Sequence, residues 1–237
     1  RGLGDVYKRQ GSGMIYPDMA TMLAFLTCDV GVDKEEWDKM ISIAVKKSFN
    51  AISVDGETST NDAFLAINSG KKIDKKFLSK IQSGIDIVCQ SLAKNIARDG
   101  EGANCLLEVL VQGAKNNSDA IKIAKSICNS SLVKTAVHGC DPNWGRIISA
   151  AGNSGIDCKL DDIDLYIGDF QILKRGKLNK YDANKVAKYM RKKMNGKYLV
   201  EDIIAITLNL NSGTEKGTAW GCDLSKKYVE INSQYTT

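Results

Sequence analysis

Short apolar runs of strand length alternate along this chain with segments whose apolar residues recur at helical intervals, and this alternation constrains the fold more than any other feature. The run at 21–30 is typical of a strand buried on both faces. The segments 33–49, with Asp33 and Glu36 in capping-box spacing, and 77–96 both have helical periodicity. Strands that alternate with helices predict an α/β fold of layered sheets and helices.

The remaining apolar segments continue this alternation to the C-terminus. Their patterns predict further strands at 105–114, 132–140, 164–168, 202–213 and 227–237, and further helices at 118–130, 144–152 and 182–194. The segment 52–70, rich in Gly, Ser, Thr and Asp, is predicted to be a polar loop. Only two prolines in 237 residues indicate no extended linker, and a subdivision of the chain near residue 155 is left open.

Composition and charge argue against several classes of protein. The net charge of +5 is spread along the chain and aromatic residues make up only 7%, so we expect no nucleic-acid partner. The longest apolar stretch, 19–28, is too short to span a bilayer, so we expect no membrane segment. The seven cysteines show no CxxC spacing and His138 is the single histidine, so we expect no metal site. Scattered thiols in apolar contexts are typical of a reduced, cytoplasmic protein.

The segment PDMATMLAF, at 17–25, places a threonine at the start of an apolar run. One interpretation of Thr21 is the preference of threonine for strands. The other is cleavage of the Ala20–Thr21 bond, which would make Thr21 a new N-terminus. Its α-amine has a reference pKa of roughly 7.7–8.0, against roughly 10.4 for lysine, so it would serve as general base for its own hydroxyl.

Four motifs, in this order, favour cleavage: GSGMIYPDMATMLAFLTCD, VDGETSTND, RDGEGAN and HGCDPNWGRI. Together they closely resemble the bifunctional ornithine acetyltransferase / glutamate N-acetyltransferase family of arginine biosynthesis, over residues 11–237. The resemblance implies a self-cleaving fold of the N-terminal-nucleophile type, cut between Ala20 and Thr21. Residues 11–20 would then end an α chain, and 21–237 would form the β chain. Residues 1–10 have no hydrophobic period and are predicted to be foreign to the protein.

The resemblance also implies a reaction, with Thr21 as the catalytic residue. Thr21 is expected to take an acetyl group from N-acetylornithine, or from acetyl-CoA in bifunctional members, and to pass it to L-glutamate through an ester. Acetyl-CoA is a co-substrate in this scheme, and no resident cofactor is expected. In the family, the oxyanion donors lie in an upstream α chain and the enzyme is an α2β2 assembly. Without that α chain, this chain is expected to be inactive or very weak and prone to association.

Substrate contacts of the family correspond to three positions besides Thr21. Glu101 is expected to meet the substrate's ammonium group, and Asn232 and Thr237 match the family's tail residues. The family lysine before GSGM corresponds to Gln10, which has no charge to pair with a substrate carboxylate. Gln10 thus supports the interpretation that the first ten residues are not native; the alternative is a member with altered substrate binding.

Other polar residues have structural interpretations. Five loop residues are predicted to shape the floor of the site: Asp55, Thr58, Thr60, Asn61 and Asp62. His138 and Cys140 would face one side of the predicted strand 132–140, where core packing is favoured over catalysis. Three residues are predicted to fasten a turn to the next helix, the first as a possible cap: Asp141, Asn143 and Arg146.

Two other functions are weighed against acetyl transfer. A hydrolase or aminopeptidase on a similar self-cleaving scaffold would use water in place of glutamate as the acceptor. A basic binding module without catalysis would be retained on heparin in a salt-sensitive way and form no acyl-enzyme. Glu101 and the polar C-terminal tail favour an amino-acid acceptor over water.

Overall fold

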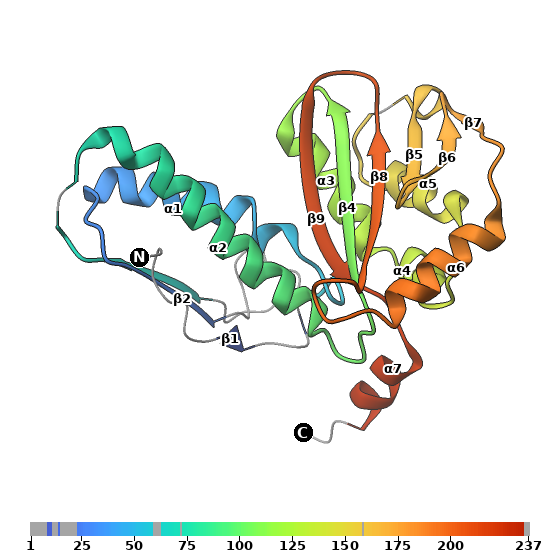
Figure 1. Cartoon of the computed structure of the whole chain (residues 1–237), viewed down its shortest axis with the longest axis horizontal. Coiled ribbons are helices and arrows are strands. Elements are labelled where there is room, and N and C mark those ends of the chain that lie inside the picture. The colour runs from blue at the N-terminus through green and yellow to red at the C-terminus, as the bar shows by residue number, and fades with distance from the viewer. Residues whose placement is uncertain are drawn as a thin grey trace.

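Two hydrophobic cores organise the chain, each formed where helices cover a β-sheet (Figure 1). The computed structural model describes residues 9–10, 14, 23–58, 63–71, 73–157 and 159–234. One core lies beneath a three-stranded sheet near the N-terminus, and the other beneath a six-stranded sheet. The predicted α/β fold of layered sheets and helices is confirmed.

The N-terminal layer is a three-stranded sheet under two helices. Its strand order is β1-β2-β3: β2 (Leu23–Cys28) pairs in parallel with β3 (Ala63–Asn68) and antiparallel with β1 (Arg9–Gln10). The helices α1 (Lys34–Lys46) and α2 (Leu78–Arg98) confirm the periodicity seen in the sequence. Asp33 is the N-cap residue of α1, but its side chain forms no capping hydrogen bond.

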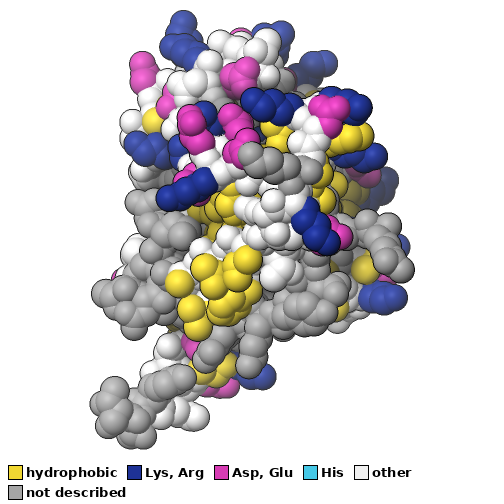
Figure 2. Space-filling view, turned by 90° about the vertical axis from the view of Figure 1, so that its left-hand side faces the viewer, with side chains coloured by type: hydrophobic (Ala, Val, Ile, Leu, Met, Phe, Trp, Pro, Cys, Tyr) yellow, Lys and Arg dark blue, Asp and Glu magenta, His cyan; other side chains and the backbone are white. Residues whose placement is uncertain are grey.

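Only one face of β2 is buried, which corrects the expectation of a strand covered on both faces. Alternate residues of β2 point toward the helices and are at most 4% exposed: Ala24, Leu26 and Cys28. Leu23 and Phe25 are 42% and 40% exposed, and in the paired strand β3 Leu65 and Ile67 are 50% and 52% exposed. These four side chains form what we call the apolar sheet face. Figure 2 shows hydrophobic side chains gathered at this end of the molecule.

The six-stranded sheet has the order β7-β6-β5-β8-β4-β9. Its strand β4 (Leu106–Ala114) pairs in parallel with β8 (Ile203–Asn209) and antiparallel with β9 (Glu215–Cys222). The other strands follow beyond β8: β5 (Asp164–Ile167), β6 (Phe170–Lys174) and β7 (Lys177–Leu178). Segments from both sides of residue 155 therefore contribute strands to one sheet.

Four helices cover one face of the six-stranded sheet: α3 (Asn117–Asn129), α4 (Ser131–His138), α5 (Trp144–Gly152) and α6 (Ala183–Met194). Ile123 and Ile127 of α3, one turn apart, are buried with Val109 and Val111 of β4. Short 3-10 helices add η1 (Phe49–Ala51), η2 (Lys75–Phe77) and η3 (Leu160–Asp162). Within the described ranges, no helix has the length and apolarity that crossing a membrane requires.

The segment 132–140 is helical, contrary to the predicted strand. The Ser130 side chain accepts a hydrogen bond from the Val133 amide at 3.4 Å and begins α4. Val133 and Val137 are buried one helical turn apart. Valine, threonine and valine at 133, 135 and 137 also alternate as in a strand, so only burial against the sheet separates the two interpretations.

The sequence patterns also failed at three further places. The predicted C-terminal strand is a helix over its described part, α7 (Lys226–Ser233), and the predicted loop 52–70 contains β3. β9 was not predicted, because glycines 217 and 221 weaken its strand pattern. A Cβ atom at Gly217 would lie 2.5 Å from the Ile121 nitrogen, so glycine lets α3 approach this strand closely.

Candidate functional site

In the sequence, the predicted nucleophile lies two residues before β2. Thr21 and Ala20, and with them the predicted scission point, lie outside the described residues, and so does Thr237 at the other end of the chain. The described chain resumes with β2 at Leu23. The roles of these three residues remain predictions.

Glu101 and Asn232 are brought together by the fold. Although 131 positions separate them, the Asn232 Nδ2 atom donates a hydrogen bond to Glu101 Oε2 at 2.7 Å. Glu101 lies in the turn 99–105 that follows α2, and Asn232 lies on α7. Asn232 is exposed and Glu101 is partly exposed, so both can be reached by a ligand. Two residues that the sequence assigned to one site are therefore neighbours, and their contact with substrate remains a prediction.

The turn that carries Glu101 requires glycine at position 102. Gly102 has a φ of +72°, and a Cβ atom there would lie 2.7 Å from the Tyr228 nitrogen and 2.8 Å from Ser225 Oγ. The Ser225 hydroxyl, at the start of α7, donates to the Gly102 carbonyl at 2.7 Å. Glycine, which has no side chain, therefore allows the turn and α7 to approach closely.

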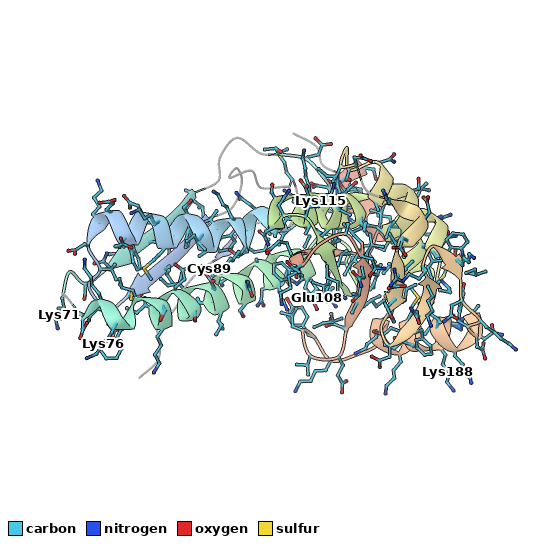
Figure 3. All side chains as sticks on the ribbon, turned by 90° about the horizontal axis from the view of Figure 1, so that it is seen from above. Lys71, Lys76, Cys89, Glu108, Lys115 and Lys188 are labelled. Atoms are coloured by element: carbon cyan, nitrogen blue, oxygen red, sulfur yellow. The ribbon has the colours of Figure 1, made fainter. Side chains whose placement is uncertain are left out.

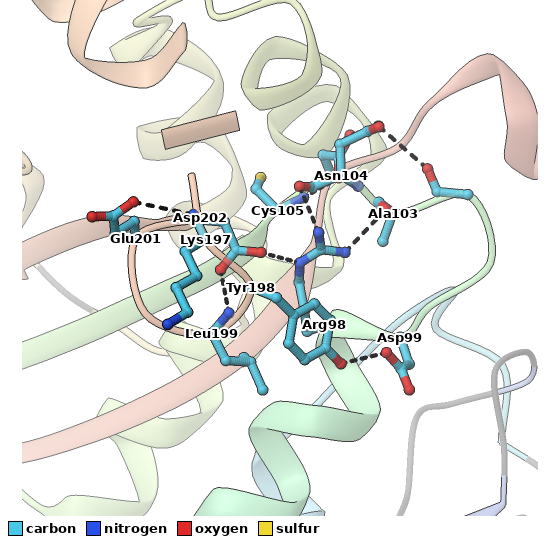
Figure 4. A network of polar contacts seen from close by, with 12 residues as sticks. Arg98, Asp99, Ala103, Asn104, Cys105, Lys197, Tyr198, Leu199, Glu201 and Asp202 are labelled. Atoms are coloured by element: carbon cyan, nitrogen blue, oxygen red, sulfur yellow. Dashed lines mark hydrogen bonds and ion pairs between the residues drawn. The ribbon is translucent and has the colours of Figure 1, made fainter. Parts of the chain in front are cut away.

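Arg98 holds the turn from one side (Figure 4). Its side chain is 15% exposed, and its Nε atom donates to the fully buried carboxylate of Asp202. Its Nη1 and Nη2 atoms donate to the carbonyl oxygens of Ala103 and Asn104 at 3.0 and 2.9 Å. The guanidinium also lies 5.1 Å from the ring centroid of Tyr198. The Arg98 guanidinium thus joins the end of α2, the turn and the segment before β8.

Asp223 holds the same turn from the other side. Its carboxylate is fully buried and accepts from the amides of Asn104 and Cys105 at 2.6 and 3.1 Å, and from Asn104 Nδ2 at 2.9 Å. The Nδ1 atom of His138 lies 2.9 Å from Asp223 Oδ2. Asp202 precedes β8 and Asp223 follows β9, and both strands flank the beginning of β4. The sheet topology therefore places both carboxylates beside the turn.

A second loop, 53–58, carries the predicted floor residue Asp55. The two carboxylate oxygens of Asp55 accept from the amides of Glu57 at 3.0 Å and Met14 at 2.5 Å. The buried Lys134 side chain of α4 donates to the Val54 carbonyl. Asp55 thus connects this loop to the segment that leads to the predicted scission point. Three further predicted floor residues lie outside the described residues: Thr60, Asn61 and Asp62.

The two loops bring three carboxylates near Tyr228 of α7. Burial raises the pKa of Tyr228, and the carboxylates of Asp55, Glu101 and Glu57 raise it further. A phenol whose ionisation is opposed by three acids lies in a negative potential. Such a potential favours a ligand that carries an ammonium group.

His138 and Cys140 do not share a strand. His138 ends α4, and Cys140 follows in a turn with a φ of +53°. Asp223 provides His138 with an acidic partner that the sequence did not reveal. Burial raises the pKa of the Cys140 thiol, which lowers its thiolate fraction and its reactivity. In the described part of the chain, no group of three or more His, Cys, Asp or Glu side chains is arranged to hold a metal ion.

The turn before α5 is fastened as predicted, although a different residue is the cap. The Asn143 side chain accepts from the Arg146 amide at 3.2 Å, and Asp141 accepts from Asn143 Nδ2 at 3.0 Å. Arg146 also donates to the Leu132 carbonyl at 2.9 Å, which ties α5 to α4. Asn143 therefore caps the helix, and Asp141 orients the cap.

Sequence reasoning missed Arg98, Asp202 and Asp223. Arg98 directly precedes the Asp-Gly-Glu-Gly turn, and this adjacency is the one local signal. Asp202 and Asp223 are single acids at the ends of apolar segments, a pattern shared with many solvated acids. Only the pairing of β8 and β9 with β4 identifies them as neighbours of Glu101.

Layered sheets and helices, with carboxylates gathered beside a glycine turn, define an α/β protein with an acidic candidate site. The ArgJ family model matches residues 6–237, and the chain belongs to this family. This result confirms the resemblance of the four motifs.

Named relatives and one solved structure agree with this assignment. "Arginine biosynthesis bifunctional protein ArgJ" of Prochlorococcus marinus subsp. pastoris (strain CCMP1986 / NIES-2087 / MED4) is 90% identical over 228 residues, which are 96% of this chain and 57% of that protein. The protein of the same name from Prochlorococcus marinus (strain NATL2A) is 54% identical over 96% of this chain and 54% of its own length. The crystal structure of arginine biosynthesis bifunctional protein ArgJ from Bacillus halodurans has a TM-score of 0.84 and 39% identity, covering 91% of this chain and 100% of that one. The chain thus spans little more than half the length of these curated relatives.

Proposed function

We propose that the protein carrying this chain transfers an acetyl group from N-acetylornithine, and from acetyl-CoA where it is used, to L-glutamate in arginine biosynthesis. The observation that carries this proposal is membership of the ArgJ family over residues 6–237. The hydrogen bond between Glu101 and Asn232 at 2.7 Å supports it, because the family resemblance assigns both residues to substrate binding. The acetyl transfer in this scheme requires no bound cofactor.

A single maturation step precedes the reaction: net hydrolysis of the Ala20–Thr21 bond adds one water, leaving a carboxylate on Ala20 and a free α-amine on Thr21. The liberated α-amine of Thr21 takes the proton of the Thr21 hydroxyl, and Oγ attacks the acetyl carbonyl carbon of N-acetylornithine. The amide C–N bond breaks, the proton passes to the leaving nitrogen, and ornithine departs. The amine of glutamate then attacks the acetyl ester, so N-acetylglutamate leaves and Thr21 recovers its proton.

The bound substrates meet carboxylates and neutral polar groups in this scheme. Glu101 pairs with the substrate's ammonium group, and the carboxylates of Asp55 and Glu57 favour the same cation through space. Asn232 and Thr237 contact the polar end of the substrate. Donors for the tetrahedral oxyanion come from the N-terminal part of the full protein, where each removed donor typically costs about 3–4 kcal/mol of transition-state stabilisation.

The partner in this proposal is an α chain of the same precursor, in a cytoplasmic α2β2 assembly. Two observations support it. The curated relative extends well beyond this chain, which covers 57% of it. The apolar sheet face is exposed on the described chain and is suited to burial against another layer.

The test is the fate of the acetyl group in a chimera that joins this chain to the N-terminal part of the 90% identical relative. We expect acetyl transfer from N-acetylornithine to glutamate to exceed release of acetate. Predominant acetate release would instead identify a hydrolase on the same scaffold. The chain by itself is expected to be inactive or very weak, and robust transfer by it would contradict the assignment of the oxyanion donors.

Substitution of Thr21 tests the nucleophile in the same chimera. Thr21→Ala removes the hydroxyl, so we expect neither chain separation on a denaturing gel nor an acetyl-enzyme in intact-mass spectra. Thr21→Ser keeps a hydroxyl and is expected to retain some cleavage. Normal turnover by Thr21→Ala would remove Thr21 from the mechanism.

A further inference from the structure

We infer that Asp223 and Arg98 are positioning residues for acetyl transfer, because they hold the turn 99–105 in the conformation that presents Glu101 to the substrate. This inference rests on the proposed function and deepens it. Neither residue is placed in contact with substrate. Each acts through the backbone of the turn and thereby through Glu101.

We call Arg98 and Asp223, which hold this turn, the clamp. Each of the two binds backbone groups of complementary polarity. Arg98 is a cation and donates to two carbonyl oxygens, those of Ala103 and Asn104. Asp223 is an acid and accepts from two successive amides, those of Asn104 and Cys105. Hydrogen bonds to charged groups away from water are stronger than neutral ones, so the turn is held at both its acceptors and its donors.

The clamp is itself held by the sheet. The carboxylates of Asp202 and Asp223 both have zero exposure, and each has partners on more than one segment. Asp202 accepts from the Leu199 amide at 2.7 Å, and its backbone carbonyl accepts from the Leu106 amide at 3.0 Å. Asp223 is anchored to α4 through His138. The turn is therefore fastened to elements that cannot shift without disturbing the sheet.

Asp223 lies three residues before the start of α7 in the chain. Ser225, two residues further on, donates to the Gly102 carbonyl, and Asn232 of the same helix donates to Glu101. The turn and α7 are thus joined at two points, at Glu101 itself and at the neighbouring Gly102. A shift of the turn would therefore move Glu101 relative to Asn232.

A held carboxylate binds an ammonium group better than a mobile one, because less freedom is lost on binding. It also keeps the acetyl group in line with the nucleophile, and a misplacement of about 1 Å can cost about a hundredfold in rate. Cleavage of the Ala20–Thr21 bond involves no ammonium substrate. Loss of the clamp should therefore impair acetyl transfer and spare chain separation.

The first test is Asp223→Asn in the chimera of this chain with its N-terminal part. Asparagine keeps the shape and one acceptor oxygen, but it removes the charge and one of the two acceptors. We expect normal chain separation and a KM for N-acetylornithine raised about tenfold or more. Asp162→Asn is the matched control, because Asp162 forms an exposed ion pair with Arg175 and should leave KM unchanged.

The second test is a double-mutant cycle with Glu101→Gln, which separates positioning from general stability. If Asp223 acts through Glu101, Asp223→Asn should add little to the KM defect of Glu101→Gln. Fully additive effects on KM would overturn the inference. Arg98→Lys keeps the charge but loses the forked pair of donors, and it should show the same lack of additivity with Glu101→Gln. This variant replaces Asp223→Asn in the cycle if Asp223→Asn does not fold.

A measurement without turnover distinguishes the two proposals. Hydrogen exchange should accelerate at the amides of Asn104 and Cys105 in Asp223→Asn, and not in Asp162→Asn. A wild-type chimera that transfers no acetyl group would overturn the proposed function, whatever the exchange rates. An active wild type with unchanged KM and unchanged exchange in Asp223→Asn would overturn the positioning role alone.

Discussion

At position 102 the absence of a side chain decides how closely the C-terminal helix can approach the predicted substrate site. Gly102 has a left-handed backbone and lies against the Tyr228 nitrogen and Ser225 Oγ. The contact between Glu101 and Asn232 is therefore supported by a residue that has no side chain of its own. At the scale of single residues, the site depends on its backbone as much as on its charges.

Gly102→Ala is expected to destabilise the protein through two effects. The left-handed conformation costs an alanine about 1–2 kcal/mol, and the collision with α7 should add about 1–3 kcal/mol. Gly155→Ala is the matched control, because Gly155 has the same φ of +72° and a Cβ atom there would meet nothing within 4 Å. Urea unfolding of both variants measures the difference. Equal losses of stability in the two variants would show that α7 shifts away from the added Cβ atom without further destabilising the protein.

At the scale of elements, β2 and β3 belong to a sheet that helices cover on one face only. The helices α1 and α2 cover one face, and the apolar sheet face remains open in the described chain. Burying a large apolar side chain stabilises a protein by about 1.5–3 kcal/mol, so four such residues in one face favour association with another surface. The strands thus indicate where a partner layer would lie.

The double substitution Leu65→Lys with Ile67→Lys is expected to reduce self-association of the isolated chain. Both side chains lie on the apolar sheet face and are half exposed, so charge there opposes burial without disturbing the core. Sedimentation velocity over a range of concentrations should show a shift toward the monomer. The control is Ile87→Lys on α2, a position that is 68% exposed and lies outside this face. An equal effect of the control would argue against a specific surface.

At the scale of the whole molecule, α2 joins the two layers. Near its C-terminal end Lys94 pairs with Glu108 of β4 at 2.8 Å, and Glu108 accepts from Trp220 Nε1 of β9 at 2.7 Å. Cys89, further back on α2, lies in the N-terminal core between the helices (Figure 3). Every described cysteine is buried and free, so thiols are distributed through both cores.

These buried thiols make the stability sensitive to alkaline pH. Burial raises the pKa of Cys89 to about 12 and that of Cys222 to about 11. An unfolded cysteine ionises at about pH 8.5, so above that pH the unfolded chain loses protons that the folded chain keeps. The free energy of unfolding should therefore fall as the pH rises from about 8.5 toward 11.

Urea unfolding between about pH 7 and 10 checks this expectation. Each such thiol contributes a slope of at most about 1.4 kcal/mol per pH unit. Cys89→Ala should reduce the slope relative to the wild type, which separates the thiol from other alkaline groups. An identical slope in that variant would contradict the assignment to Cys89.

The sequence by itself determined the elements whose apolar residues repeat without ambiguity. The helices α1, α2, α3, α5 and α6 and the strands β2, β4, β5 and β8 follow from their own periodicity, because burial of one face is encoded locally. The motif around Glu101 likewise indicates the family without reference to any tertiary contact. The sequence of a single segment is therefore enough to predict a helix or strand whose apolar residues repeat clearly, and to recognise a family motif.

Tertiary structure decided the rest. Valines at 133 and 137 satisfy strand and helix alike, and only packing under the sheet makes α4 a helix. The apolar run of β2 could not reveal that one of its faces lies open. Asp202 and Asp223 look like ordinary acids until β8 and β9 bring them to the turn from distant parts of the chain, as the 104 positions between Arg98 and Asp202 illustrate. Contacts between such distant segments depend on strand order, which no short segment specifies.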